Sequence, residues 1–379
     1  MQLNLDKIIS ENKKRLSHSA HGGEIYNTGL DHVLNQIIDF STNVNPLINH
    51  EISKQTYINS INHVPLYPDS NSTNLKREIV VYFDNMIKTE NLIVGAGSME
   101  IISIFCEIFI ETGDEVIIAH PTFSEYAWAV RKKEGSIVNV YRKPNNDFRI
   151  ECKSILNQIN SKTKAIFICN PNNPNGLLDN LSDIQKIINE TSKHDVLVLL
   201  DEAFIEFTGE DNSFIKKILD FDNLLICRGF SKYFGLTGLR VGYGVSTPEI
   251  INLITKGQNL WSVNCIGQIL AQKSLKSKKF IENSYIFFKK ERQFLIEELR
   301  RISGLRIFPT DTNYILINSE NIGIKSSEIK KLMLEKNILV RDCSNYEGLD
   351  GYYIRIAIKT RKLNLKLLQN LKDCFSPTN

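Results

Sequence analysis

A chain of 379 residues, with 42% hydrophobic and 23% charged residues, has the composition of a globular protein long enough for about two domains. The formal net charge of +3, with Lys and Arg scattered among acids, excludes the concentrated basic surface typical of nucleic-acid binding. No apolar run approaches the ~20 residues that span a bilayer, and residues 1–15 lack the apolar centre of a signal peptide. We therefore expect a cytoplasmic protein that contacts neither nucleic acid nor membrane.

Short β-branched runs alternate with helical patterns through the middle of the chain. This alternation predicts an α/β fold in which a mostly parallel sheet is covered by helices on both faces. Strands are expected at Asn91–Val94, Glu115–Ala119, Ala165–Cys169, Val196–Leu200 and Leu224–Cys227, and helices at Met99–Ile110, Ser124–Lys133 and Leu181–Ser192.

After about residue 255 the pattern changes to an α+β order, which predicts a second domain. We place the large domain at residues 47–255, and a smaller α+β domain at residues 1–46 plus 256–379. The elements expected in the second part are a long charged helix at Phe280–Ile302, strands at Tyr314–Ile317 and Tyr353–Ile358, and a helix at Ser326–Lys336.

The seven cysteines follow no CxxC or Cys/His ligand spacing. Cys106, Cys169 and Cys227 all lie in apolar runs, which is typical of small core residues. We therefore expect neither a disulfide framework nor a metal site.

The strongest chemical signal is the pair Ser231-Lys232, which follows an apolar run and precedes the segment Gly-Leu-Arg-Val-Gly at residues 238–242. A lysine on a loop beside glycines can approach a ligand closely and, when desolvated, becomes a usable amine nucleophile. A lysine after a strand is more often a solvated surface residue, so this motif does not decide alone.

Two polar motifs also follow strands. Asp201 comes directly after the apolar run 196–200, where a carboxylate can pair with a protonated ring nitrogen. Asn173 lies in the run Asn-Pro-Asn-Asn-Pro-Asn-Gly at residues 170–176, and a rigidly held amide there can donate to a phenolate oxygen or a carboxylate. Taken singly, these two motifs are better explained by a helix cap or structural ion pair and by a plain turn.

The segment Gly-Ala-Gly-Ser-Met-Glu at residues 95–100 leads from a strand into an apolar helix. Free backbone N–H groups at a helix start, beside glycines, form a phosphate site. The segment matches neither the dinucleotide pattern GxGxxG nor a Walker loop, which counts against a nucleotide-binding oxidoreductase.

The order of these signals is more specific than any one of them. A glycine loop, Phe123, Asn173, Asp201, Lys232 and Arg240 follow one another, each at a strand end. This succession resembles fold-type I enzymes of the class I/II aminotransferase family over essentially the whole chain. The resemblance implies pyridoxal 5'-phosphate as cofactor.

The resemblance also implies a role for each matching residue. Lys232 would hold the cofactor as a Schiff base and then serve as acid/base catalyst, and Asp201 would pair with the pyridinium nitrogen. Asn173 would hydrogen-bond the phenolate oxygen, and Phe123 would stack on the ring. The cofactor phosphate would be bound by Gly97, Ser98, Met99, Ser231, Arg240 and, from a partner subunit, Tyr67, which implies a homodimer.

One position departs from the family pattern. Many relatives carry tyrosine where this chain has Phe204, three residues after Asp201. The tyrosine hydroxyl donates to the phenolate oxygen of the cofactor. Its loss removes one donor and puts ordinary transaminase tuning in doubt, but leaves cofactor binding possible.

Local motifs narrow the resemblance to the threonine-phosphate decarboxylases within this family. They are His21-Gly22-Gly23 and the segments 39–46, 121–126, 261–264 and 340–350. They imply a carboxy-lyase that converts L-threonine O-3-phosphate, or L-serine O-phosphate, into the aminopropanol phosphate linker of cobalamin or its analogue. The substrate would be bound by His21, Asn43, Asn173, Arg341, Ser344, Asn345 and Arg355, in which the two arginines act as cationic forks for phosphate and carboxylate.

Two alternatives within the same fold stay open. A histidinol-phosphate-type aminotransferase using 2-oxoglutarate shares every cofactor residue. A catalytically inactive binding protein is disfavoured, because Lys232, Asp201 and Asn173 are all present.

Overall fold

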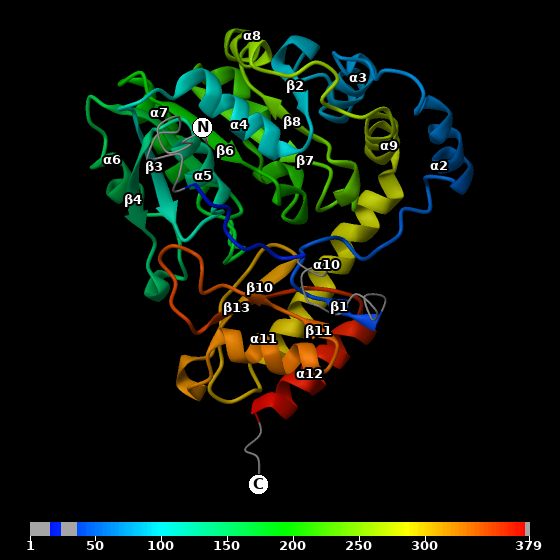
Figure 1. The fold of residues 1–379 in the computed structure, drawn as a ribbon, viewed down its shortest axis with the longest axis vertical. Coiled ribbons are helices and arrows are strands. Elements are labelled where there is room, and N and C mark those ends of the chain that lie inside the picture. Colours follow the sequence, from blue (N-terminus) through cyan, green and yellow to red (C-terminus); the bar gives the residue numbers. More distant parts are fainter. Residues whose placement is uncertain (1–15, 24–35, 376–379) are drawn as a thin grey trace, which may run out of the picture.

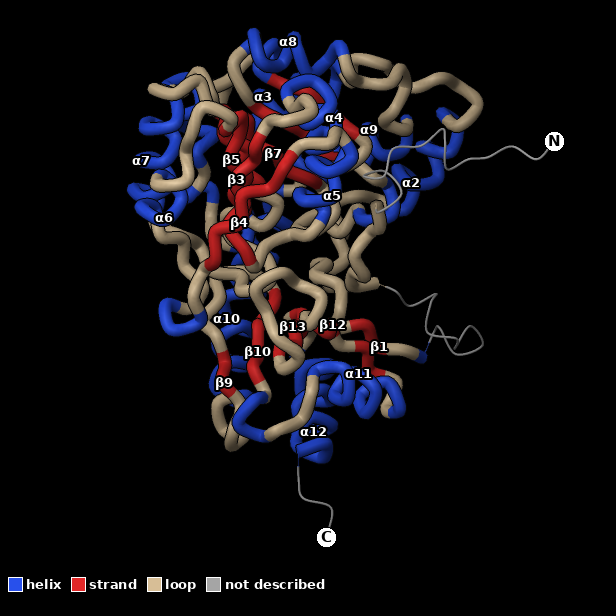
Figure 2. Tube along the Cα trace, turned by 60° about the vertical axis from the view of Figure 1, so that its left-hand side comes forward, coloured by secondary structure: helices blue, strands red, loops and turns tan. Residues whose placement is uncertain are grey.

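The computed structural model describes residues 16–23 and 36–375. Its largest element is a seven-stranded sheet with the order β2-β8-β7-β6-β5-β3-β4 (Figures 1 and 2). Only β8 runs antiparallel to its neighbours. This confirms the expected α/β class with a mostly parallel sheet. The strands are β2 (Leu92–Gly95), β3 (Glu115–His120), β4 (Ser136–Tyr141), β5 (Thr163–Cys169), β6 (Leu197–Asp201), β7 (Leu224–Gly229) and β8 (Gly242–Val245).

Helices cover both faces of this sheet because its strands are apolar on both sides. Successive residues of β6 point to opposite faces, so Val198 and Leu200 join one buried cluster and Leu199 the other. Helices α3 (Thr73–Tyr82), α7 (Leu181–Ser192) and α9 (Cys265–Lys276) contribute to the first cluster, and α4 (Ser98–Phe109), α5 (Glu125–Lys132) and α8 (Pro248–Lys256) to the second. Two short helices are α2 (Lys54–Ser60) and α6 (Cys152–Leu156).

A smaller antiparallel sheet with the order β12-β13-β10-β9 lies below the large one in Figure 1. A separate parallel pair, β1 with β11, ties residues 38–39 to this part. The limits of the two domains stay a prediction. The elements of this part are β1 (Ile38–Asp39), α10 (Lys278–Leu299), β9 (Arg306–Ile307), β10 (Tyr314–Asn318), α11 (Ser326–Glu335), β11 (Ile338–Leu339), β12 (Arg341–Asp342), β13 (Tyr353–Ala357) and α12 (Arg361–Phe375).

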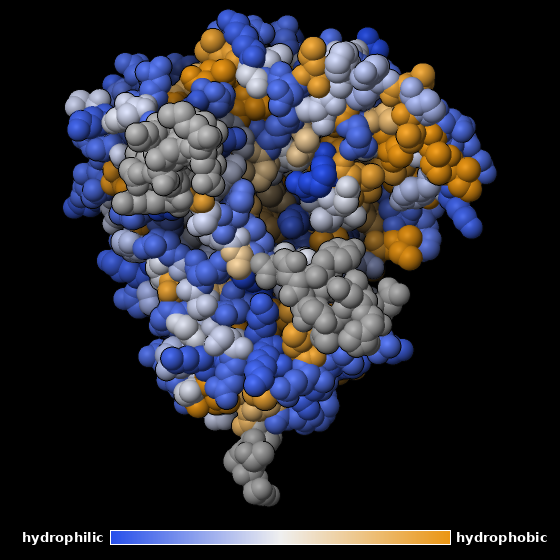
Figure 3. Space-filling view, in the orientation of Figure 1, coloured by the Kyte–Doolittle hydropathy of each residue, from blue (hydrophilic) through white to orange (hydrophobic). Residues whose placement is uncertain are grey.

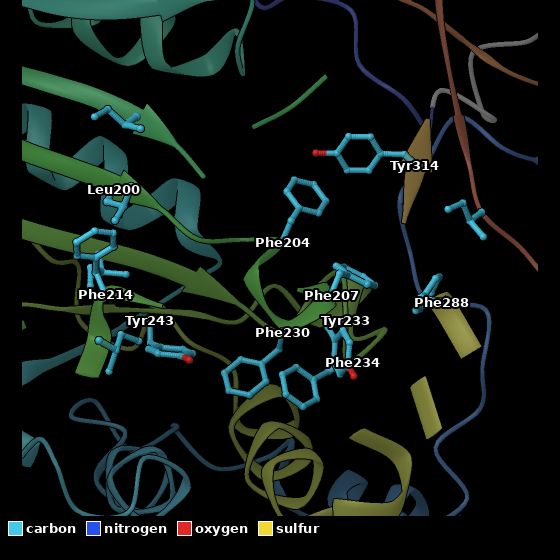
Figure 4. Packing of buried hydrophobic residues seen from close by; sticks show 14 of the residues in the cluster. Leu200, Phe204, Phe207, Phe214, Phe230, Tyr233, Phe234, Tyr243, Phe288 and Tyr314 are labelled. Atoms are coloured by element: carbon cyan, nitrogen blue, oxygen red, sulfur yellow. The ribbon is translucent and has the colours of Figure 1, made fainter. Parts of the chain in front are cut away.

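Aromatic side chains join the two parts into one core. Phe204, after β6, lies 4.9 Å from Tyr314 of β10 between ring centroids. Phe207 meets Phe288 of α10 at 4.8 Å, with the rings nearly perpendicular (Figure 4). Such edge-to-face pairs add to the free energy gained by burial. The two parts are therefore held against each other directly behind the end of β6.

Two strands of the large sheet were absent from the sequence prediction. Only one residue of the edge strand β4 is buried, and the others are half-buried or exposed. Strand β8 contains Gly242 and Gly244, which weaken any strand signal. Gly242 is required there, because a Cβ atom at that position would lie 2.4 Å from the backbone nitrogen of Ser98.

Cys106, Cys169 and Cys227 are buried, as expected, and all seven cysteines are free thiols. Within residues 16–23 and 36–375, no helix combines the length and the apolar character needed to cross a bilayer.

Candidate active site

A cavity of about 250 Å³ opens between the two sheets at the carboxyl ends of β5, β6 and β7. Open parallel sheets bind ligands at this edge, because the strand ends and the following loops converge there. The space-filling view shows a hollow in this region between the upper and lower parts (Figure 3). The residues expected at the site that line the cavity are His21, Asn43, Ser98, Met99, Phe123, Asn173, Asp201, Ser231, Lys232, Arg240 and Arg355.

Lys232 lies on the loop after β7 and reaches into this cavity. Burial lowers the pKa of its ammonium group from 10.5 to about 8, and the positive charges of Arg355 and Arg240 act in the same direction. The neutral amine is therefore far more populated near physiological pH than that of an ordinary lysine. This is the form that attacks a carbonyl and accepts a proton.

Asp201 ends β6 and is 4% exposed. Its Oδ2 accepts a hydrogen bond from the hydroxyl of Tyr126 at 2.6 Å, and its Oδ1 accepts one from the backbone N–H of Ala203 at 3.0 Å. Burial raises the pKa of the Asp201 carboxyl, while these hydrogen bonds and the charge of Lys232 lower it. A cationic ring nitrogen beside this carboxylate would further favour the ionised form.

An anion cradle lies at the start of α4. Gly97 has φ +83°, and a Cβ atom there would lie 2.6 Å from Nη2 of Arg240. Only glycine lets this loop pass so close to the guanidinium. The N–H groups of Ser98 and Met99 occupy the first turn of a helix, where no intrahelical acceptor exists. Nη1 of Arg240 lies 3.3 Å from the Ser231 hydroxyl, so these groups converge on one phosphate-sized position.

Arg355 lies on β13 at the opposite wall and is 5% exposed. Its Nη1 donates to Oδ1 of Asn173, and its Nη2 donates to the backbone oxygen of Ser41 at 3.0 Å. The hydroxyl of Tyr346 also lies 3.1 Å from Oδ1 of Asn173. The Nε of Arg355 is buried and has no hydrogen-bond partner among the described residues.

Five residues expected at the site do not line the cavity. Gly97 lies just behind the cradle, and Tyr67 is 79% exposed and packs against Trp261 at 4.6 Å. Arg341 is buried beside Arg355 on the neighbouring strand, but its Nη2 donates to the backbone oxygen of Ala20 at 2.6 Å. Ser344 and Asn345 are exposed on the loop after β12. The roles expected for these residues stay predictions.

Two tyrosines at the site were not predicted from the sequence as site residues. Tyr126 holds Asp201, and Tyr346 contacts both Asn173 and Arg355. Tyr126 was visible in the segment Pro-Thr-Phe-Ser-Glu-Tyr, three residues after Phe123, which places it one helical turn from a cavity residue. Tyr346 follows an irregular loop, and no local pattern indicates its direction.

These residues fit pyridoxal 5'-phosphate. The glycine-lined cradle suits its phosphate, Lys232 suits its aldehyde carbon, and Asp201 suits its pyridinium nitrogen. Phe123 and Arg355 also line the cavity, where the guanidinium charge suits a substrate anion. The site is therefore that of a pyridoxal-phosphate enzyme of the aminotransferase fold.

Comparisons with known proteins agree with this class. Residues 35–371 match the family aminotransferase class I and II, and the chain belongs to this family, whose members depend on pyridoxal phosphate. The chain is 35% identical to a histidinol-phosphate aminotransferase of Methanococcus aeolicus over 89% of its length and 90% of the relative. The solved histidinol-phosphate aminotransferase of Clostridium acetobutylicum has a TM-score of 0.81 at 32% identity, over 89% of this chain and 99% of that one.

The comparisons also correct the narrower expectation. The solved L-threonine-O-3-phosphate decarboxylase of Porphyromonas gingivalis is 25% identical, with a TM-score of 0.76 over 88% of this chain and 98% of that one. Because the aminotransferases are closer at 32–35% identity, the prediction of a carboxy-lyase acting in cobalamin synthesis is wrong. The two activities share their cofactor residues. The choice between them depends on which bond at the substrate Cα is aligned with the ring, and short motifs do not encode that orientation.

Proposed function

We propose that the protein is an aminotransferase that takes histidinol phosphate as amino donor and 2-oxoglutarate as acceptor. The observation that carries the proposal is the 35% identity to a histidinol-phosphate aminotransferase over 89% of the chain. The cavity supports it, because a phosphorylated amine and a dicarboxylate both require cationic groups. Arg355 and Arg240 line the cavity, and Arg341 lies opposite Arg355 on β12 but outside the lining.

Each residue of the site has a distinct task in this reaction. When bound, pyridoxal phosphate supplies an electron sink for the bond that breaks at the substrate Cα. The neutral Nζ of Lys232 would take the proton from the substrate Cα and would return it to the carbon on the other side of the amine nitrogen. The carboxylate of Asp201, held by Tyr126, keeps a positive charge at the ring nitrogen. Arg355 orients the substrate anion through a planar fork.

Replacing Arg355 with lysine should raise the KM for 2-oxoglutarate about 10- to 100-fold, because the compact ammonium lacks the planar fork whose separate nitrogens reach Asn173 and the Ser41 carbonyl while facing a carboxylate. Steady-state kinetics with varied 2-oxoglutarate measures this change. Arg306→Lys, at an exposed position on β9, serves as the control and should behave as the wild type. An unchanged KM in Arg355→Lys would show that Arg355 does not bind this substrate.

The substrate is tested directly on the cofactor-loaded enzyme. With histidinol phosphate and 2-oxoglutarate we expect glutamate to form at a rate typical of metabolic enzymes, about 1–1000 per second. L-threonine O-3-phosphate, given without a keto acid, should release no CO2. The proposed function is refuted if L-threonine O-3-phosphate releases CO2 while histidinol phosphate and 2-oxoglutarate give no glutamate.

We also propose that the protein is a homodimer, as the family resemblance implied. Apolar side chains gather around α2 at the right of Figure 3. Apolar patches of this kind on a single chain mark association surfaces. The exposed residues of this region include Tyr57, Ile58, Ile61, Val64, Leu66, Tyr67, Leu260 and Trp261.

A further inference from the structure

Residues 16–23, here called the N-terminal strap, lie across one side of the cavity. Two of them, His21 and Gly22, are lining residues. In Figure 1 the strap is the dark blue segment that runs from beside α5 towards the region between the two sheets. The contacts that hold it come from elements far away in the sequence.

One anchor of the strap is Glu125, the first residue of α5. Its Oε1 lies 2.7 Å from Nε2 of His21, and its Oε2 lies 2.9 Å from Nδ1 of His18. Both oxygens of a side chain only 8% exposed are thus engaged by imidazole nitrogens of the strap. His18 also stacks on Trp128, with ring centroids 4.3 Å apart, one helical turn after Glu125.

The other anchor lies on the small-sheet side. The backbone oxygen of Ala20 accepts from Nη2 of Arg341 at 2.6 Å and from Nδ2 of Asn345 at 2.9 Å. The N–H of Gly23 donates to the hydroxyl of Ser41 at 2.9 Å. Gly22 fits so closely that a Cβ atom there would lie 2.2 Å from the Ser41 carbonyl oxygen.

These contacts place the strap against the substrate anion site. The same Ser41 carbonyl that crowds Gly22 accepts a hydrogen bond from Arg355, so the strap lies beside the guanidinium that would hold the substrate. Glu125 itself is not a lining residue of the cavity. Its side-chain contacts to the strap connect it to the cavity.

We propose that Glu125 is a positioning residue that, through His18 and His21, holds the N-terminal strap closed over the substrate pocket. This inference rests on the proposed function for its kinetic consequence, but not for its structural one. Binding of the phosphorylated amine should depend on the strap, whereas the proton transfer performed by Lys232 should not. The expected signature is a change in KM without a matching change in kcat.

The test compares Glu125→Gln with the wild type as cofactor-loaded enzymes. Glutamine has nearly the same shape but has only one acceptor oxygen and no charge, so it can accept from only one imidazole. We expect hydrogen–deuterium exchange of residues 16–23 to become about 10-fold faster, because hydrogen bonds to a charged group are lost. The KM for histidinol phosphate should rise by a similar factor, with kcat within about twofold of the wild type.

A second variant and a control distinguish the loss of the contacts between Glu125 and the strap from a general loss of structure. His18→Phe keeps an aromatic ring on Trp128 but removes the nitrogen that meets Glu125, and should change exchange and KM in the same direction. Glu107→Gln, an exposed glutamate on α4, should leave both unchanged.

The inference is overturned if exchange of residues 16–23 is unchanged in Glu125→Gln, or if kcat falls while KM stays constant. If the wild type does not turn over histidinol phosphate, the proposed function fails. The exchange measurement alone then decides whether Glu125 holds the strap.

Discussion

Lys232→Met should reduce transamination by about 10⁴-fold or more, because it removes both the amine that attaches the cofactor and the base that moves the Cα proton. Methionine is chosen because it fills nearly the same volume without a charge. The rate of glutamate formation from histidinol phosphate and 2-oxoglutarate measures the loss. Lys88→Met, at a surface position with an 80% exposed side chain, should retain full activity.

The same substitution should stabilise the cofactor-free protein at neutral pH. The pKa of Lys232 is about 8 in the fold against an ordinary value of 10.5, so the folded state resists protonation. Such a shift corresponds to about 3 kcal/mol, and we expect about 1–2 kcal/mol because the cavity admits water. Urea unfolding of both cofactor-free proteins at pH 7 measures the difference.

The difference in unfolding free energy between wild type and Lys232→Met should change with pH in a definite direction. Between pH 8 and 10.5 the unfolded chain binds a proton at Lys232 that the folded chain does not, so wild-type stability rises with pH in this window. The advantage of Lys232→Met should therefore be full below pH 8 and vanish towards pH 10.5. A constant difference across this range would show that burial does not penalise the ammonium group.

Arg228→Met should lower the free energy of unfolding by about 3–5 kcal/mol, since it leaves buried carboxylates without their cation. Arg228 is fully buried, and its guanidinium lies 3.0 Å from Glu202, 3.6 Å from Glu206 and 2.9 Å from Glu210. Burial already raises the pKa of Glu206 to about 8. Loss of the arginine leaves the buried Glu202 carboxylate behind the active site without its cation.

The decrease in the free energy of unfolding caused by Arg228→Met should be smaller at pH 5 than at pH 8, because protonation neutralises the carboxyl groups that lost their partner. Urea unfolding at the two pH values measures this trend. Arg301→Met, with a 69% exposed side chain on the surface, is the matched control and should change stability by less than about 0.5 kcal/mol. Equal losses at both pH values would show that the network contributes by packing and not by charge.

Much of the large sheet could be predicted from the sequence because its strands are short, apolar on both faces and separated by turn residues. The expected helix at Leu181–Ser192 has those bounds in the structure, and the strands ending at Cys169 and near Asp201 differ by two residues or fewer. The same order of polar residues at consecutive strand ends carries the family resemblance that implied the cofactor, and these residues meet at one edge of the parallel sheet.

The sequence by itself therefore determined the fold class through local patterns repeated in chain order, and the family resemblance carried by its motifs implied the cofactor and the role of Lys232. Only the tertiary structure brought Tyr126 to Asp201, Tyr346 to Asn173 and the N-terminal strap to Glu125. These pairs are 75, 173 and 104 residues apart, so no periodicity links them. The reaction was misjudged for a related reason: the bond that breaks depends on how the assembled pocket orients its substrate, and that orientation arises from such distant contacts together.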